Sequence, residues 1–220
     1  MILNALADYY ETLAKQGKAA RPGWGNAKIS FALELWEGGE LLRVTPLSSP
    51  SPDGKKMLPM MLMLPAAVKR TANPESNFLW DNSAYLLGFD GKGKPEHAKE
   101  CFLKAKELHS SLLSGSPDAF AGAVRAFFER WEPDGAADDP LFADSINDLA
   151  KGANLVFSFH GKFPAENKVL CRAWQEHYDG DEGGEKMRCL ITGEEAVPQS
   201  VHPSIKNVAG AQSSGAALVS

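Results

Sequence analysis

Two long segments with helical periodicity, residues 95–113 and 117–131, most constrain the fold of this chain. Apolar residues recur at spacings of three and four in both, as in amphipathic helices that bury one face. The first segment begins at Pro95, and proline is favoured at the first position of a helix. The apolar positions are Ala98, Cys101, Phe102, Ala105 and Leu108 in the first segment and Phe120, Val124, Phe127, Phe128 and Trp131 in the second.

Short strand patterns lie on both sides of these helices. Residues 28–36 and 41–46 indicate two strands joined at Glu37-Gly38-Gly39-Glu40, which is a hairpin signal. Separated short strands combined with helical hairpins favour an α+β fold over a doubly wound parallel sheet. We therefore predict a mixed, mostly antiparallel sheet with flanking helices, and we consider a helical insertion at 95–150. The other expected strands are 57–64, 85–89, 154–160 and 186–192, and the other expected helices are 2–16, 141–150 and 165–178.

The most apolar of the predicted strands is 57–64, which we expect to be buried. Its methionines are interpreted as side chains that fill the core. Pro59 stands near its start, and proline is unfavourable inside a sheet. Trp24 lies in a loop at 21–26 and is interpreted as a packing anchor rather than a contact residue.

The composition is ordinary for a soluble globular protein, with 220 residues, 44% hydrophobic and 23% charged. Apolar runs fall short of the roughly 18 to 20 residues that a membrane span needs, and the N-terminus lacks a signal-peptide pattern. Three cysteines without a CxxC pair fit reduced thiols better than a disulfide framework. We expect a cytoplasmic protein that has no membrane partner.

The net charge of −5 argues against tight binding to DNA by this chain alone, because such binders are usually basic. It leaves room for a local basic patch. The acidic residues gather at 129–148 and 179–185. The first half therefore keeps basic residues with few acidic neighbours, namely Lys55, Lys56, Lys69, Arg70, Lys92 and Lys94.

Motifs for catalysis or cofactor binding are absent from the sequence. It has no GxxxxGK[ST] loop, no GxGxxG after a strand and no HExxH. Cys171, Cys189, His177 and His202 offer a Cys/His metal set, but Cys171 and His177 are six residues apart, which is unusual for structural zinc. Cys189 could act as a nucleophile with His160 or His202 as its base, but no local motif supports this pairing. We predict no cofactor and no catalysis, with a metal-dependent nuclease or a thiol hydrolase as the alternative.

Residues 65–82 mix basic, amide and aromatic side chains that suit nucleic acid. Lysine and arginine neutralise phosphates, and asparagine can read base edges. In the alternative, the aromatic residues belong to the core and the asparagines cap local backbone. The candidates are Lys69 and Arg70 for phosphates and Asn77 and Asn82 for base edges, with Lys28 as a further candidate.

A second candidate stretch is a polar triplet flanked by glycines near residue 212. Gly210 and Gly215 allow the backbone to turn and to approach a ligand closely. Gln212 offers a donor and an acceptor, and Ser213 and Ser214 add hydroxyl groups. Such a loop can meet a phosphate or a base edge, and Lys206 lies just before it to hold a phosphate. The alternative is an ordinary polar turn.

Four ordered blocks carry a family resemblance. They are MILNALADYY at 1–10, KISFAL at 28–33, VKR at 68–70 with NFLWDN at 77–82, and CLITGEEAVPQSVHPSIKNVAGAQSSGAALVS at 189–220. The chain resembles the large subunit of the type I-C CRISPR Cascade complex. Family members are much longer, so the resemblance implies that 1–220 is the N-terminal domain of a longer large subunit.

The resemblance implies a non-catalytic subunit that recognises the protospacer-adjacent motif on duplex DNA and helps R-loop formation in antiviral defence. Its implied partners are double-stranded target DNA, the other Cascade protein subunits, CRISPR RNA and the helicase-nuclease that the complex recruits. In such complexes a few side chains read a short duplex motif, while base pairing to the RNA reads the rest. A scaffold that only binds neighbouring subunits through apolar faces is a third interpretation.

Overall fold

The computed structural model describes residues 2–16, 18–70, 73–89, 91, 93–136, 139–180 and 185–198. It contains two compact units, residues 17–179 and residues 1–16 with 180–220. The larger unit holds most of the helices and strands, and the smaller holds one long helix and a short hairpin. Helices combined with mostly antiparallel strands confirm the predicted α+β class. Among the described helices, none is both long and apolar enough to span a membrane.

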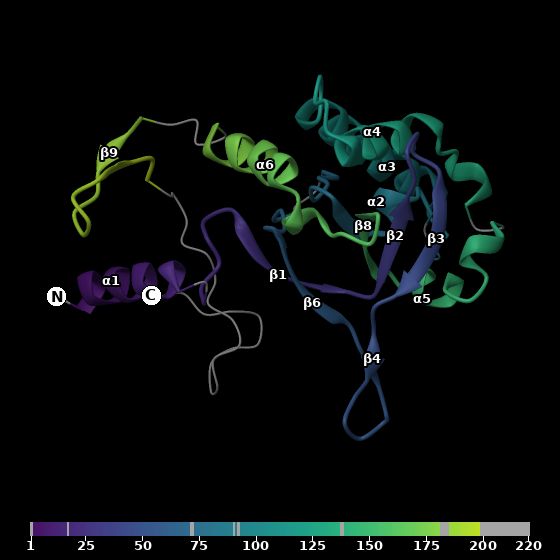
Figure 1. The fold of residues 1–220 in the computed structure, drawn as a ribbon, viewed down its shortest axis with the longest axis horizontal. Coiled ribbons are helices and arrows are strands. Elements are labelled where there is room, and N and C mark those ends of the chain that lie inside the picture. Colours follow the sequence, from purple (N-terminus) through teal and green to yellow (C-terminus); the bar gives the residue numbers. More distant parts are fainter. Residues whose placement is uncertain are drawn as a thin grey trace. The chain divides into compact units, whose positions relative to one another are not determined.

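The centre of the larger unit is a four-stranded sheet in the order β3-β2-β8-β7 (Figure 1). β2 and β8 pair in parallel, whereas β3 and β7 pair antiparallel with their neighbours. Every residue of β2 is buried, as expected for a strand covered on both faces. The glycine turn at 38–39 joins β2 to β3 and confirms the predicted hairpin. The strands are β2 (Phe31–Leu35), β3 (Leu41–Pro46), β7 (Trp80–Asn82) and β8 (Asn154–Phe159).

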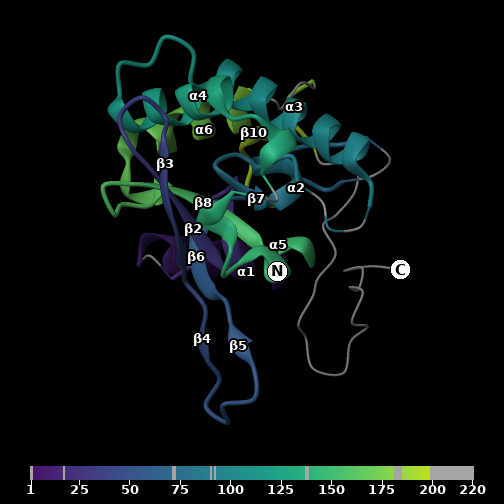
Figure 2. The same cartoon turned by 90° about the vertical axis from the view of Figure 1, so that its right-hand side faces the viewer.

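Two helices, α3 (Pro95–Leu112) and α4 (Ala119–Arg130), cover one face of this sheet (Figures 1 and 2). Their apolar stripes are the predicted ones and supply much of the core. Asp118 caps α4 by accepting a hydrogen bond of 3.0 Å from the backbone N–H of Ala121. The shorter helices α2 (Ser83–Leu86) and α5 (Ile146–Ala150) and the longer α6 (Lys168–Gly180) complete the unit.

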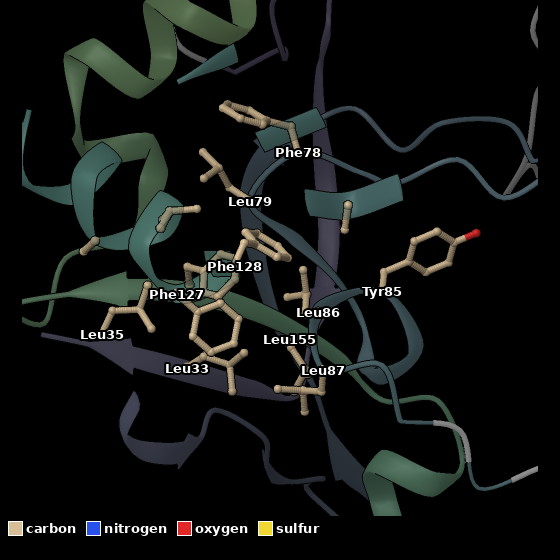
Figure 3. Packing of buried hydrophobic residues seen from close by; sticks show 14 of the residues in the cluster. Leu33, Leu35, Phe78, Leu79, Tyr85, Leu86, Leu87, Phe127, Phe128 and Leu155 are labelled. Carbon is tan, nitrogen blue, oxygen red and sulfur yellow. The ribbon is translucent and has the colours of Figure 1, made fainter. Parts of the chain in front are cut away.

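Aromatic rings fill the space between the helices and the sheet. Phe127 and Phe128 of α4 lie against Leu33 and Leu35 of β2 (Figure 3). Both rings meet Phe157 of β8 nearly edge to face, with centroids 5.2 and 5.7 Å apart. Such arrangements are favourable for aromatic pairs. The helical hairpin is therefore fixed to the sheet by large interlocking side chains.

One polar side chain, His109 of α3, is completely buried in this core. Its Nε2 accepts a hydrogen bond of 2.8 Å from the backbone N–H of Leu79, and its Nδ1 donates to the carbonyl oxygen of Ala105 at 2.7 Å. Leu79 has a φ of 69°, which is rare for a residue with a branched side chain. Burial lowers the pKa of His109 to about 4. The imidazole is therefore neutral at pH 7, and its free nitrogen lone pair holds Leu79.

A two-stranded ribbon of β1 (Trp24–Ile29) and β6 (Met60–Pro65) extends from the sheet. Its inward side chains, among them Ile29 and Leu64, form a second core cluster with Trp80 and Val156. A hairpin, which we call the arm, consists of β4 (Ser49–Pro50), β5 (Met57–Leu58) and their turn. The arm projects from the sheet, away from α3 and α4 (Figure 2).

Four strand predictions were wrong in whole or in part. Residues 28–36 do not form one strand, because β1 ends at Ile29 and β2 begins at Phe31 in a different sheet. Residues 57–64 form no single buried strand, because Pro59 separates β5 from β6 and most of the side chains are exposed. The predicted strand at 85–89 is instead α2 with a following turn, since the Asn82 side chain accepts from the N–H of Ala84 and caps a helix. Of 186–192, only β9 (Met187–Arg188) is a strand, and it pairs with β10 (Glu195–Ala196).

The smaller unit contains α1 (Ile2–Lys15), the predicted N-terminal helix, and the β9–β10 hairpin. The Asn4 side chain donates a hydrogen bond of 3.0 Å to the carbonyl oxygen of Ile191. No residue of α1 is buried. The helix and the hairpin thus meet through a polar contact rather than through an apolar core.

The buried histidine predicts a specific pH dependence of stability. Between about pH 6.5 and pH 4 the unfolded chain binds a proton at residue 109 that the folded chain does not bind, so stability falls as the pH falls. Each pH unit in this interval should cost about 1.4 kcal/mol. In urea unfolding at several pH values, His109→Gln should lower stability at pH 7 and remove this slope. His97→Gln on the exposed side of α3 should retain it, and an unchanged slope in His109→Gln would contradict this assignment.

Candidate nucleic-acid interface

Positive charge is concentrated on the ribbon, on β3 and the arm, and on the segment that follows β6. Residues 24–29 and 41–70 contain six basic residues and one acidic residue, whereas the whole chain has a net charge of −5. A local basic surface on an acidic chain is the arrangement that suits contact with phosphates. The basic residues are Lys28, Arg43, Lys55, Lys56, Lys69 and Arg70, and the acidic residue is Asp53.

The register of the ribbon determines which side chains face outward. Lys28 pairs with Met61 and Asn26 with Met63, and all four are exposed. Ala27, Ile29, Leu62 and Leu64 belong instead to the second core cluster, because side chains alternate between the faces of a strand. The outward face of the ribbon therefore carries a lysine and an amide beside two methionines.

The only acidic residue of this region, Asp53, is used to shape the turn of the arm. Its Oδ1 accepts hydrogen bonds from the Ser51 hydroxyl at 2.5 Å and from the N–H of Lys55 at 3.2 Å. The bond from Ser51, followed by the one from Lys55, lowers the pKa of the Asp53 carboxyl. Gly54 has a φ of 68°, which the tight turn requires. Lys55 and Lys56 are thus exposed at the end of a defined turn.

The three lysines of α3 are neutralised by acidic neighbours. Lys99 pairs with Asp134 at 2.8 Å, Lys104 with Glu107 at 2.8 Å and Lys106 with Glu129 at 3.3 Å. In the part of the chain that the structure describes, by contrast, none of Lys28, Arg43, Lys55, Lys56 and Lys69 forms an ion pair. These five cations remain free to meet an external anion.

Arg70 differs from its exposed neighbour Lys69. Its guanidinium forms an ion pair with the buried carboxylate of Asp81 and donates to the carbonyl oxygen of Glu75 at 2.7 Å. The same group lies 4.0 Å above the ring of Tyr85, in cation–π geometry. Arg70 is thus committed to the fold, whereas Lys69 carries a free charge.

Asp81 organises the backbone around it. It accepts hydrogen bonds from the N–H of Asn77 at 2.9 Å and from its own neighbour Asn82 at 2.7 Å. Burial raises the pKa of the Asp81 carboxyl, while Arg70 and the two N–H groups oppose the shift. The carboxylate is only 1% exposed, so the ion pair with Arg70 offsets the cost of burying its charge.

The two asparagine candidates contact the chain's own backbone. Asn77 is 4% exposed, and its side-chain oxygen accepts from the N–H of Val68 at 2.9 Å. Asn82 caps α2. Phe78 and Trp80 belong to the core. This arrangement agrees with the structural interpretation of the stretch, so we leave Asn77 and Asn82 out of the proposed interface.

Trp24 is a packing anchor, as predicted. It is 8% exposed, and its ring N–H donates to the side chain of Gln175 in α6 at 3.0 Å. Arg21 lies 4.2 Å above its ring. The other candidates, Lys206, Gly210, Gln212, Ser213, Ser214 and Gly215, lie outside the described residues.

Two cysteines, Cys101 and Cys189, bear on the alternative thiol chemistry. Cys101 lies 3.6 Å from Nε2 of His97 and hydrogen-bonds the Tyr85 hydroxyl, but burial raises the pKa of its thiol. The thiolate that attacks in such reactions is therefore disfavoured. Hydrogen bonds from Thr192 lower the pKa of Cys189, in the β9–β10 hairpin. Among the described residues, no three His, Cys, Asp or Glu side chains are grouped to hold a metal.

Arg43 was not among the basic residues singled out from the sequence. That Lys55 and Lys56 form no ion pair with any described residue could be seen only in the structure. The sequence feature that could have indicated Arg43 is that Asp53 is the single acidic residue between 41 and 70. What the sequence did not reveal was that Asp53 is held by its own turn and Arg70 by Asp81.

The contrast between adjacent cations yields a prediction about stability. Arg70→Ala leaves the Asp81 carboxylate buried without its partner and should lower the free energy of unfolding by about 2 to 3 kcal/mol. Lys69→Ala should change it by less than about 0.5 kcal/mol, because the side chain is exposed and makes no ion pair in the described structure. Urea unfolding of the two variants measures this. Equal effects would show that the Arg70–Asp81 pair is not a structural requirement.

Comparison with known proteins identifies the family of the chain. A search of curated proteins returned no match. The model of the family described as CRISPR-associated protein (Cas_Csd1) matches residues 6–220, which is nearly the whole sequence. The match includes the ribbon, the arm and the Lys69–Asn82 stretch described above. The chain therefore belongs to the Cas_Csd1 family of CRISPR-associated proteins.

Proposed function

We propose that this chain is the N-terminal domain of the large subunit of a type I-C CRISPR Cascade complex. In this role it recognises the protospacer-adjacent motif on duplex target DNA and helps R-loop formation. Membership in the Cas_Csd1 family supports a CRISPR-associated role, and the four sequence blocks quoted above support the finer assignment. Its partners would be the other protein subunits, the CRISPR RNA and the helicase-nuclease that the complex recruits.

The observation that carries the proposal is the basic region whose lysines have no ion-pair partners in the described structure. Phosphate contacts supply most of the affinity of proteins for DNA and position the protein on the duplex. We assign these contacts to Lys28 and Lys69, which are exposed, and to Lys206. We assign base contacts to Gln212, Ser213 and Ser214, with Gly210 and Gly215 allowing a close approach.

We further propose that the subunit is not an enzyme. The buried Cys101 is poorly suited to act as a nucleophile, because burial raises its pKa. To recognise a short duplex motif, the subunit has only to bind DNA and to discriminate between motif sequences. Base pairing to the RNA reads the rest of the target. Cleavage is left to the recruited helicase-nuclease.

The phosphate contacts should be visible in the salt dependence of target binding. Each lost contact reduces the slope of log K against log salt by about 0.9, so Lys28→Ala with Lys69→Ala should reduce it by about two. The measurement is target binding by the assembled complex over a salt series. Lys104→Ala is the matched control, because Lys104 is exposed but already paired with Glu107. A double variant with the wild-type slope would remove both lysines from the interface.

Motif reading is tested at the glycine-flanked loop. Gln212→Ala removes the donor and acceptor pair and should cost about 1 to 3 kcal/mol of discrimination among targets that differ only in the adjacent motif. Subunit assembly and affinity for non-target DNA should be unchanged. Competition binding with the assembled complex measures the preference. If Gln212→Ala and Ser213→Ala both keep full discrimination, the motif is read elsewhere.

A further inference from the structure

Large apolar side chains of β5 and β6 lie exposed to solvent. Single exposed apolar residues are common on protein surfaces, but five exposed apolar side chains within residues 57–63, on both faces of β5 and β6, are unusual. We call these five residues the methionine surface. They are Met57 (60% exposed), Leu58 (45%), Met60 (41%), Met61 (52%) and Met63 (39%).

The described chain covers neither side of the arm. Met57 and Leu58 are consecutive residues of one strand, so their side chains point to opposite faces, and both are exposed. The arm projects from the sheet of the larger unit (Figure 2). On the ribbon, Met61 and Met63 face outward, whereas Met60 pairs with Ile29 on the opposite face and is still 41% exposed.

A pocket of about 450 Å³ at the base of the arm extends this surface. Its apolar lining comes from Phe31, Pro46, Met57 and Pro59. Met57 belongs to both the pocket and the methionine surface, so the two are continuous. Asp144, Asp148 and Lys151 also line the pocket. A partner side chain can insert here while neighbouring residues lie along the arm.

The charges at the turn of the arm indicate what kind of surface it meets. Lys55 and Lys56 are exposed there, and neither forms an ion pair with any residue that the structure describes. Asp53 is already bonded to its own turn. The complementary surface therefore carries carboxylates facing the turn, next to an apolar area.

The chemistry of the side chains favours protein over nucleic acid. Methionine and leucine offer no charge and no strong donor, whereas most contacts to DNA are hydrogen bonds to phosphate and sugar. Methionine is enriched in protein interfaces, because its flexible thioether adapts to irregular apolar surfaces.

We propose that the methionine surface docks onto a protein subunit of the same CRISPR-associated complex, against an apolar area bordered by carboxylates. The proposal rests on the proposed membership in a multi-subunit complex, but not on DNA recognition. The phosphate contacts assigned to Lys28 and Lys69 can fail while docking holds, and the reverse is also true.

Oxidative footprinting tests the proposal on the unmodified protein. In the free full-length protein, hydrogen peroxide should oxidise Met57 and Met187 at similar rates, since both are 60% exposed. In the assembled complex, oxidation of Met57 and Met60 should slow about tenfold, as for side chains buried in an interface. Mass spectrometry of the peptides gives both rates. Unprotected Met57 and Met60 in the complex would overturn the proposal.

Substitution provides the second test. Met57→Gln with Met60→Gln keeps side-chain length but adds polarity, and it should reduce recovery of the other subunits in affinity purification about tenfold. Leu103→Gln on α3 is the control, because Leu103 is 57% exposed and lies off the surface. All variants should keep the wild-type thermal melt, since no substituted side chain is buried.

Three results would overturn the docking assignment. The first is unchanged assembly in the double glutamine variant. The second is normal assembly with lost binding of target duplex, which would place DNA on the methionine surface. The third is altered self-association of the protein in the absence of other subunits, which would make a second copy the occupant. Lys28→Ala with Lys69→Ala should leave assembly intact, so failure of docking is distinguishable from failure of DNA recognition.

Discussion

The fold depends on the hydrogen bond that Leu79 donates to His109. With a positive φ, Leu79 leaves the regular strand geometry, so its buried N–H needs an acceptor. The imidazole nitrogen supplies one from a helix 30 residues later in the chain. The carbonyl of Leu79 in turn accepts from the N–H of Phe157. One irregular residue therefore joins α3 to β8, and protonation of His109 would remove the lone pair that makes this possible.

The neighbouring Asp81 determines how the basic residues divide their roles. A carboxylate that is almost fully buried needs a cation, and Arg70 supplies it from 11 residues earlier. This requirement engages one cation of an adjacent pair in an internal ion pair and leaves Lys69 without one. The Asp53 carboxylate is likewise engaged within the chain, because it accepts hydrogen bonds inside its own turn. The free positive charge of the basic region thus depends on internal contacts as well as on the number of lysines. Its single acidic residue, Asp53, is bonded to its own turn, and one of its arginines, Arg70, is paired with Asp81.

Local patterns made much of the fold predictable. The helical periodicity at 95–113 and 117–131 and the glycine turn between β2 and β3 depend on neighbouring residues, and both were found. Burial of 57–64 depends on whether another layer covers it, which apolar composition alone cannot tell. At 85–89 the cap by Asn82 prevailed over strand propensity. In the candidate site, Lys28 and Lys69 are exposed as a phosphate contact requires. The ion pair of Arg70 and the burial of Asn77 both involve Asp81, several residues away, and no local pattern reveals them.

The arm has a consequence for how selection acts on this chain. Residues 49–58 bury no side chain, so outside the turn at Asp53 and Gly54 the stability of the domain places little restriction on which residues occur there. In the core, selection acts against a substitution of Phe127 or Phe157 because it impairs folding. In the arm, selection acts against most substitutions only when they impair a contact with a molecule outside the domain. Apart from the turn residues Asp53 and Gly54, the pattern of substitutions that evolution tolerates between Ser49 and Leu58 therefore records external contacts more than the demands of folding.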